Sequence, residues 1–253
     1  MSKFQKKFII TCAPRTGSTM LRMMLNSHPG IACYGEVITL KGEPNLGKKF
    51  QDSIGKTSEE LAEIRGNNPV NFLYNYIWNQ DYYQADCKAI GLKIKYRQLQ
   101  EQFKDVFQAI LDDREIRIIH LTRKNLLKRY VSNRLSGSGK TSTVILNSEE
   151  SKLQPKITVD VEKCIEDILS VQQAETKFRK YFKHHKVFEV VYEELVTSNT
   201  NILAKLMNFL EVDFLNLQPV TKKVNSDSLE DIVENYADLV SYLQKTPYAT
   251  YIQ

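Results

Sequence analysis

Apolar residues along the chain gather in four short runs that are rich in β-branched side chains. The runs are Phe8–Thr11, Ala89–Tyr96, Ile116–Thr122 and Val187–Val191, and helix-forming residues follow each of them. Near-continuous apolar runs of this length are typical of buried strands in parallel sheets, whose two faces are both covered. Strands that alternate with helices predict an α/β fold with a doubly wound parallel sheet flanked by helices and right-handed crossovers. In such a sheet, ligands bind at the carboxyl ends of the strands.

The polar positions between these runs predict the helices. Helical periodicity is clearest over residues 161–182, whereas residues 37–86 are the least regular part of the chain. Within that part, Thr57 or Ser58 is expected to cap a short helix, because two acidic residues follow in its first turn. The aromatic residues of 69–83 are expected mainly in the core, with lining of an acceptor pocket as the alternative. Further helices are expected at Met20–Leu25, Gln98–Leu111, Leu126–Arg134, Asn199–Leu210 and from a cap at Ser226 or Asp227 to Leu243.

Length and composition fit one large domain that spans residues 1–253. Hydrophobic residues make up 42% of the chain, which is enough for a substantial core. The net charge of +5 suits a small anionic ligand and gives no reason to expect nucleic acid as a partner. The four cysteines lie far apart, which predicts neither a disulfide framework nor a zinc site. Without a signal peptide or an apolar run long enough for a transmembrane segment, a cytoplasmic chain is expected.

The turn after the first predicted strand combines the features of an anion site. Residues 13–19 read A-P-R-T-G-S-T and lead directly into a predicted helix. Unpaired backbone N–H groups and the positive end of the helix converge at such a turn. Ser18 and Thr19 can add hydroxyl donors, and Arg15 can add a charged fork suited to phosphate or sulfate oxygens. We therefore expect this loop to hold a phosphate or sulfate group.

The same turn resembles a Walker A loop without matching it. Aligned on Gly17, the first glycine of a Walker A loop is replaced by Cys12 and its lysine by Ser18, which argues against ATP or GTP hydrolysis. A second partial match at residues 137–141 has an arginine at the first glycine position and follows a predicted helix where a strand is required. We interpret residues 136–158, which are rich in Ser, Thr and Gly, as a mobile loop that can act as a lid.

The segment P-R-T-G-S-T, followed by M-L-R-M-M-L-N-S-H-P-G and then G-E, resembles the 5′-phosphosulfate loop of the sulfotransferase superfamily. It is most similar to the tyrosylprotein and bacterial branches, which share the basic loop residue, the His-Pro and the later Glu. The resemblance extends over nearly the whole chain. It implies a P-loop NTPase-like single domain and 3′-phosphoadenosine 5′-phosphosulfate as the donor co-substrate. The loop residues that it assigns to donor binding are Pro14, Arg15, Thr16, Gly17, Ser18 and Thr19.

Two later segments resemble the other donor contacts of the superfamily. Arg123 follows the third predicted strand and Ser132 lies on the next helix, like the Arg and Ser that clamp the 3′-phosphate of the nucleotide. Their separation is nine residues where eight is usual, and Lys124 restores the usual spacing, so the cation is open between Arg123 and Lys124. The segment Y-E-E-L after the fourth predicted strand puts Tyr192 where the family contacts adenine, with packing at a strand end as the alternative.

The reaction implied by the resemblance is in-line attack of an acceptor hydroxyl or amine on sulfur. It needs a base for the acceptor proton and cations for the charge that builds on the leaving phosphate. Glu36 is the predicted base, because tyrosylprotein-type enzymes have their catalytic Glu in the same G-E context. Arg15 and Lys93 are the predicted catalytic cations, and no metal is required. The alternative for Lys93 and Lys95 is an edge strand whose lysines discourage aggregation.

The sequence leaves two other function classes open. A P-loop-type kinase or nucleotide phosphotransferase would use the same turn, with the missing lysine as the chief objection. A non-catalytic nucleotide-binding protein would keep the loop while Glu36 had no role. His120 could act as a base, but a histidine inside an apolar strand is expected to be packed. The acceptor, whether a small molecule, lipid, sugar or peptide, and the oligomeric state are not determined by the sequence.

Overall fold

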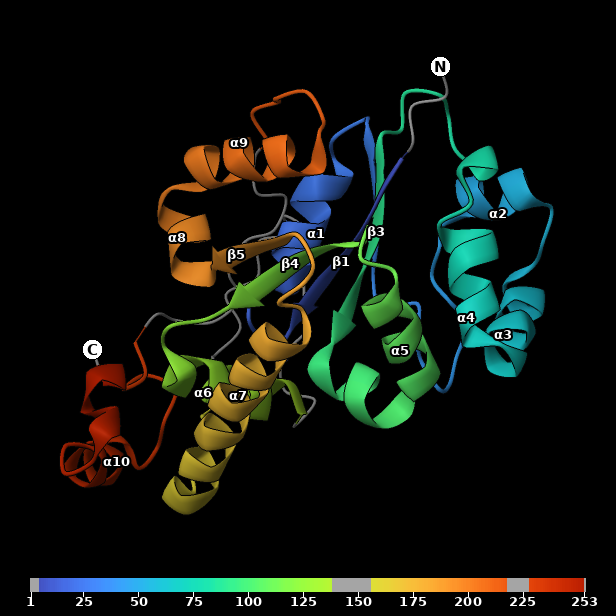
Figure 1. Ribbon diagram of the computed structural model, residues 1–253. Coiled ribbons are helices and arrows are strands. Elements are labelled where there is room, and N and C mark those ends of the chain that lie inside the picture. Colours follow the sequence, from blue (N-terminus) through green and yellow to red (C-terminus); the bar gives the residue numbers. More distant parts are fainter. Residues whose placement is uncertain (1–4, 138–155, 218–227, 253) are drawn as a thin grey trace.

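The computed structural model describes residues 5–137, 156–217 and 228–252, and its centre is a parallel sheet with helices on both faces (Figure 1). The strand order in this described part is β2-β3-β1-β4-β5, and each neighbouring pair is parallel. The doubly wound parallel sheet expected from the sequence is therefore confirmed. The strands are β1 Lys6–Cys12, β2 Ile31–Tyr34, β3 Ala89–Lys95, β4 Arg117–Thr122 and β5 Val187–Val191.

Strand β1 occupies the centre of the sheet because its sequence is apolar on both faces. Its residues from Phe8 onward are buried, and Phe8 is paired in register with Gly91 of β3 and with Arg117 of β4. The Phe8 ring covers Gly91 so closely that a Cβ at position 91 would collide with it. A glycine in a strand interior often marks such a close approach.

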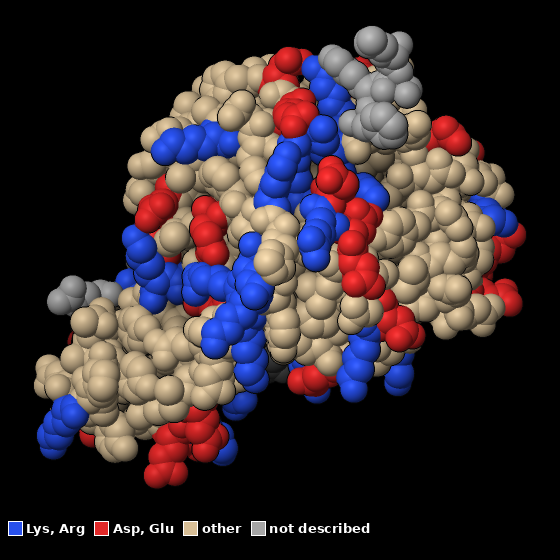
Figure 2. All heavy atoms as spheres, viewed as in Figure 1, with Lys and Arg blue, Asp and Glu red and all other residues tan. Residues whose placement is uncertain are grey.

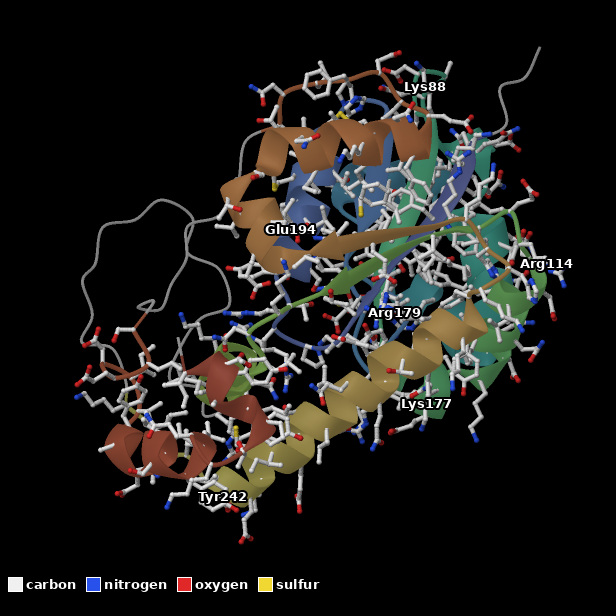
Figure 3. The ribbon with its side chains drawn as sticks, turned by 60° about the vertical axis from the view of Figure 1, so that its left-hand side comes forward. Lys88, Arg114, Lys177, Arg179, Glu194 and Tyr242 are labelled. Carbon is white, nitrogen blue, oxygen red and sulfur yellow. The ribbon has the colours of Figure 1, made fainter. Side chains whose placement is uncertain are left out.

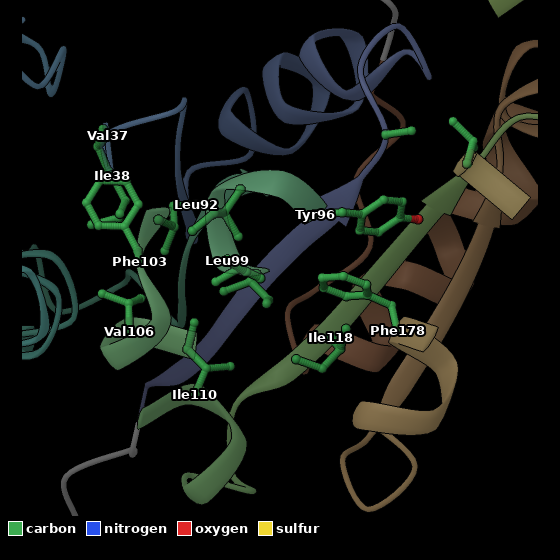
Figure 4. Close-up of a cluster of buried hydrophobic side chains, with 14 of the residues drawn as sticks. Val37, Ile38, Leu92, Tyr96, Leu99, Phe103, Val106, Ile110, Ile118 and Phe178 are labelled. Carbon is green, nitrogen blue, oxygen red and sulfur yellow. The ribbon is translucent and has the colours of Figure 1, made fainter. Parts of the chain in front are cut away.

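The helices divide between the two faces of the sheet. One face packs against α1, α8 and α9, and the other is covered by α3 to α7 and α10. On the second face, the side chains of Leu92 and Ile118 from the sheet meet those of Val106, Ile110 and Phe178 from the helices (Figure 4). The helices are α1 Ser18–Asn26, α2 Lys48–Ile54, α3 Ser58–Asn67, α4 Pro69–Phe72, α5 Lys104–Asp112, α6 Leu126–Gly137, α7 Val161–Tyr181, α8 Tyr192–Thr197, α9 Asn199–Leu210 and α10 Tyr236–Leu243, with π-helical turns at Leu73–Ile77 and Gln98–Gln102 and 3₁₀ turns at Gln80–Tyr82 and Pro247–Tyr251.

The connections place a topological switch point between β1 and β4. The helix that follows β1 lies on one face of the sheet, whereas the helices that follow β4 lie on the other. Ligands of doubly wound sheets bind outside the carboxyl ends of the strands at such a point. The residues after Cys12 and after Thr122 meet there.

Some elements differ from the sequence-based expectations. Strand β2 was not expected, and it places β3 inside the sheet, so the edge-strand interpretation of Lys93 and Lys95 is wrong. The helix expected over Gln98–Leu111 is interrupted at Phe103, whose backbone (φ −130°, ψ 60°) is not helical.

The cap of the short helix in the irregular part was predicted correctly. Thr57 caps α3 and forms a reciprocal capping box with Glu60. The final helix was predicted too long, because α10 begins only at Tyr236. The segment before it forms a parallel bridge from Val233 to Ile157. The caps proposed at Ser226 and Asp227, and residues 138–155 of the expected loop, lie outside the described residues.

Candidate active site

The turn between β1 and α1 has the backbone of an anion cradle. Arg15 and Gly17 both have positive φ angles, 66° and 83°. The Thr16 hydroxyl donates to the Ala13 oxygen at 3.0 Å, which closes the turn. Among the described residues, no side chain caps the first turn of α1. Its backbone N–H groups are therefore available to an anion.

Gly17 is needed for space as well as for its backbone angle. A Cβ at this position would lie within 2.6 Å of Cε2 of Tyr192, the first residue of α8. The Arg123 guanidinium lies over the same Tyr192 ring, with its Cζ 4.7 Å from the ring centre. The loop, Tyr192 and Arg123 thus form one packed unit.

Arg15 and Arg123 lie together at the switch point. Arg15 Nε donates to the Ser132 hydroxyl at 3.0 Å, and Arg123 donates to the Arg15 backbone oxygen at 3.1 Å. Burial lowers the pKa of Arg15, and the nearby charge of Arg123 lowers it further. The nearest acidic partner of Arg123 is Glu193, 3.9 Å from its Nε, and no ion pair to Arg15 is present among the described residues. Two adjacent, partly desolvated cations favour a bound anion.

Lys124 points away from this group. Its side chain is 64% exposed, and its Nζ pairs with Glu194 of α8 at 2.8 Å. Its backbone N–H and that of Asn125 both donate to the Glu193 carboxylate. Of the two candidates for the 3′-phosphate cation, only Arg123 contacts the loop.

Glu36 lies between two lysines at the end of β3. Lys93 Nζ is 3.0 Å from one carboxylate oxygen, and Lys95 Nζ is 2.8 Å from the other. Lys93 also donates to the Thr19 hydroxyl of the loop at 3.2 Å. Lys93 therefore connects the Glu36 carboxylate directly with the anion cradle. In the space-filling view, basic and acidic side chains alternate along the middle of one face of the molecule (Figure 2).

The environment of Glu36 keeps it ionised at neutral pH. Burial acts to raise the pKa of Glu36, but hydrogen bonding to Lys95 and the charges of Lys93 and Lys95 outweigh it, so the pKa is lowered. The carboxylate is thus in the form that can accept a proton.

The sequence analysis did not assign two basic residues, Lys95 and Arg129, to the site. Lys95 contacts Glu36, and its alternation with Lys93 along β3 is the signal that could have indicated this. Arg129 is fully buried, donates to the Pro14 backbone oxygen at 3.2 Å and pairs with Asp167 of α7. Burial, followed by the charge of Arg123, lowers the pKa of Arg129 to about 10. Its position one turn before Ser132 on α6 could have indicated that both face the loop.

His120 belongs to the interior, on the other face of the sheet from Glu36. Its ring nitrogens contact the Tyr96 hydroxyl at 2.6 Å and the Glu189 carboxylate at 2.9 Å. Arg179 reaches from α7 to the same carboxylate (Figure 3). The buried ring is therefore satisfied by its neighbours, as expected for a packed histidine.

The aromatic residues of 69–83 also pack into the interior. Phe72 and Trp78 are buried, and Tyr82 and Tyr83 contact the ring of Phe50 from α2. Within the described part of the chain, no group of three His, Cys, Asp or Glu side chains could hold a metal ion. None of the helices described is both long and apolar enough to cross a membrane.

Comparison with known proteins places this chain in a family. Residues 7–216 match the model of the sulfotransferase family. The chain belongs to the sulfotransferase family. Nodulation protein H of Rhizobium tropici is 24% identical to this sulfotransferase over 253 residues, which cover 97% of this chain and 92% of that protein.

Solved structures share the fold. The sulfotransferase domain of the Synechococcus PCC 7002 olefin synthase has a TM-score of 0.52 at 17% identity, covering 99% of this chain and 87% of that one. The sulfotransferase domain from the curacin biosynthetic pathway has a TM-score of 0.56 at 14% identity, covering 96% and 81%. The chain is therefore a transferase of the sulfotransferase family with the α/β fold of its relatives.

Proposed function

We propose that this protein transfers a sulfonate group from 3′-phosphoadenosine 5′-phosphosulfate to a hydroxyl or amine of an acceptor. The observation that carries the proposal is the position of Lys93, which contacts both the Glu36 carboxylate and the Thr19 hydroxyl. A base, a cation and an anion cradle are thereby in direct contact. Sulfonate transfer needs these three elements together.

The donor would be held at both of its anionic ends. The amides of the loop, the Ser18 and Thr19 hydroxyls and Arg15 suit the 5′-phosphosulfate. Arg123 and Ser132 suit the 3′-phosphate, because Arg123 contacts the loop and its nearest carboxylate among the described residues, that of Glu193, is 3.9 Å away. The Tyr192 ring, stacked beside Arg123, offers an aromatic surface to the adenine.

In the proposed reaction, an oxygen or nitrogen of the acceptor attacks sulfur. Its proton passes to Glu36, a bond forms between the acceptor and sulfur, and the bond from sulfur to the 5′-phosphate oxygen breaks. Adenosine 3′,5′-bisphosphate leaves with the bonding electrons. Arg15 and Lys93 stabilise the charge that develops on its phosphate.

Through Lys93, binding of the donor would make the Glu36 carboxylate more basic. Its ammonium is shared between Glu36 and the cradle, so an anion in the cradle draws it toward the loop. Glu36 then loses one of its two cations, which raises its pKa and its strength as a base. Lys95 remains to orient the carboxylate.

Glu36→Gln tests the proposal, because it keeps the side-chain shape and removes the base. We expect the affinity for adenosine 3′,5′-bisphosphate, measured by titration calorimetry, to stay within about tenfold of wild type (~1.4 kcal/mol). We expect turnover of labelled donor to fall by about 10²–10⁴-fold. Glu43→Gln, an exposed residue of the same segment, is the matched control and should leave both unchanged. Full turnover by Glu36→Gln would mean that Glu36 is not the base.

A nucleotide phosphotransferase is the alternative outcome of the binding experiment. Ser18 stands where such an enzyme has its lysine, so we expect no tight binding of ATP with Mg²⁺. Micromolar binding of ATP with Mg²⁺ and none of the 3′,5′-bisphosphate would contradict the sulfotransfer proposal. The acceptor can be identified by incubating labelled donor with a cell extract and analysing the labelled product.

The four cysteines are buried and unpaired, which supports a reducing compartment such as the cytoplasm as the place of the reaction.

A further inference from the structure

The carboxylate that the proposed reaction needs as its base lies on a segment without regular structure. Glu36 belongs to residues 35–47, between the end of β2 and the start of α2. Contacts with Lys93 and Lys95 fix the carboxylate oxygens, but they do not fix the backbone that carries them. A catalytic group has to be held within about 0.5 Å of its productive position by neighbours whose own geometry is fixed.

A buried amide joins this segment to the strand end that carries the lysines. Gln98 follows β3, and the residue is only 8% exposed. Its Oε1 accepts from the Lys95 backbone N–H at 2.8 Å, and its Nε2 donates to the Ile38 backbone oxygen at 3.0 Å. The carbonyl end of the amide faces a donor and the NH₂ end faces an acceptor, so the orientation of the amide is fixed. Gln98 thus ties the backbone beside Glu36 to the backbone of Lys95.

We propose that Gln98 is a positioning residue for Glu36, acting through the Ile38 and Lys95 backbones to hold the carboxylate against its lysines. The catalytic part of this inference rests on the proposed function, in which Glu36 is the base. The geometric part does not, because it concerns only the distance between Glu36 and Lys95. The two parts can be measured separately.

Arg65 holds the same segment in a different way. From α3, its buried guanidinium donates to the backbone oxygens of Val37 and Gly42. Both acceptors belong to the segment itself, and neither lies on β3. Arg65 therefore supports the shape of the loop, whereas Gln98 sets the distance from Glu36 to the strand.

Two substitutions and one control test the proposal. Gln98→Met keeps the length of the side chain and removes both hydrogen bonds. Gln98→Glu keeps the acceptor for Lys95 and turns a second acceptor toward the Ile38 oxygen. Gln5→Met is the matched control, because Gln5 also donates to a backbone oxygen, that of Cys87, but at the amino end of the sheet.

We expect both Gln98 variants to lower kcat by about tenfold or more, because a base displaced by about 1 Å can cost 10²-fold. The KM for donor and the affinity for adenosine 3′,5′-bisphosphate should stay within about twofold of wild type, since the cradle is untouched. A ¹³C NMR titration should show the pKa of the Glu36 carboxyl rising as Lys95 moves away. In the Glu36→Gln background, Gln98→Met should cost no further activity. Gln5→Met should change none of these quantities.

An unchanged Glu36 titration in both Gln98 variants would overturn the proposal. A loss of bisphosphate affinity that parallels the loss of kcat would also overturn it, because it would indicate a general structural role. The titration does not depend on turnover. A wild-type protein that transfers no sulfonate would therefore refute the proposed function, while the positioning of Glu36 by Gln98 would still pass or fail on the titration.

Discussion

Replacing Gly17 by alanine tests the packed unit of loop, Tyr192 and Arg123. At φ 83° an alanine is strained, and its Cβ would overlap the Tyr192 ring. Either the turn or the ring has to move. A displaced ring also loses its contact with the Arg123 guanidinium, whose Cζ lies 4.7 Å from the ring centre.

The magnitude follows from two terms. A left-handed alanine costs about 1–2 kcal/mol, and the lost contact between Arg123 and the Tyr192 ring costs about 0.5–1 kcal/mol. Gly17→Ala should therefore lower the free energy of unfolding by about 1.5–3 kcal/mol, which lowers the melting temperature by roughly 3–12 °C in a chain of this size. Affinity for adenosine 3′,5′-bisphosphate should fall by about tenfold or more, because the same groups form the proposed donor site.

Two other glycines of the chain serve as controls that separate the backbone strain of Gly17→Ala from its clash with the Tyr192 ring. Gly55 has φ 61° and open space around it, so Gly55→Ala measures the backbone strain alone. Gly66 lies in α3 with open space and no such strain, so Gly66→Ala should stabilise the helix by about 0.5–1 kcal/mol. For each variant, urea denaturation measures the free energy of unfolding, and titration calorimetry measures the affinity for adenosine 3′,5′-bisphosphate. Combining Gly17→Ala with Tyr192→Ala should remove the clash and make the two effects non-additive. The reasoning is refuted if Gly17→Ala costs no more than Gly55→Ala and binds the bisphosphate like wild type.

Three further predictions concern charges. Arg123→Met should weaken binding of adenosine 3′,5′-bisphosphate by about tenfold or more, because a charge-assisted hydrogen bond contributes about 1.5–3 kcal/mol, whereas Lys124→Met should stay within about twofold; equal losses in calorimetry would contradict the assignment of Arg123. The pKa of Glu36 is lowered, so the acid-side midpoint of the pH profile of kcat/KM should lie below the ordinary glutamate pKa of about 4.3. A midpoint pH above that value would show that another group limits the rate. Glu211→Gln should destabilise the fold by about 1 kcal/mol after allowance for solvent screening, because it leaves the buried Arg117 without its carboxylate. Hydrogen bonding to Arg117 lowers the pKa of Glu211 to about 2, below its unfolded value, so this contribution is complete above about pH 4.3 and lost as the pH falls toward 2. Urea denaturation at pH 6 and pH 3 should therefore show a smaller difference between wild type and Glu211→Gln at the lower pH, and a constant difference would contradict this origin.

The sequence predicts the central strands because their burial on both faces leaves an unbroken apolar signal. Strand β2 has no such signal: it is four residues long, and only Ile31 and Cys33 of it are buried. The start of the last helix could not be predicted for a different reason. The chain before Tyr236 hydrogen bonds with Ile157, and a contact between such distant segments is not contained in local capping rules.

The candidate site, too, could be predicted from the sequence only in part. Arg15 and Gly17 stand out because a strand, a turn and a helix follow one another in the sequence. The lysine pair on Glu36 and the Gln98 bridge arise only when the carboxyl end of β3 meets the segment after β2. The strand period links Lys93 with Lys95, but no periodicity links either of them with Glu36, because the sheet brings Glu36 to them from a separate part of the chain.

The central place of β1 has a consequence for the synthesis of the protein. Both neighbours of β1 come much later in the chain, since Lys6 pairs with Ala89 and Phe8 with Arg117. An emerging chain therefore has an unpaired apolar strand until β3 and β4 have left the ribosome. Exposed strands of this kind are prone to aggregation and are protected by chaperones. We expect nascent chains that end before β3 to be insoluble, and those that extend past β5 to be the first that can bind the proposed donor nucleotide.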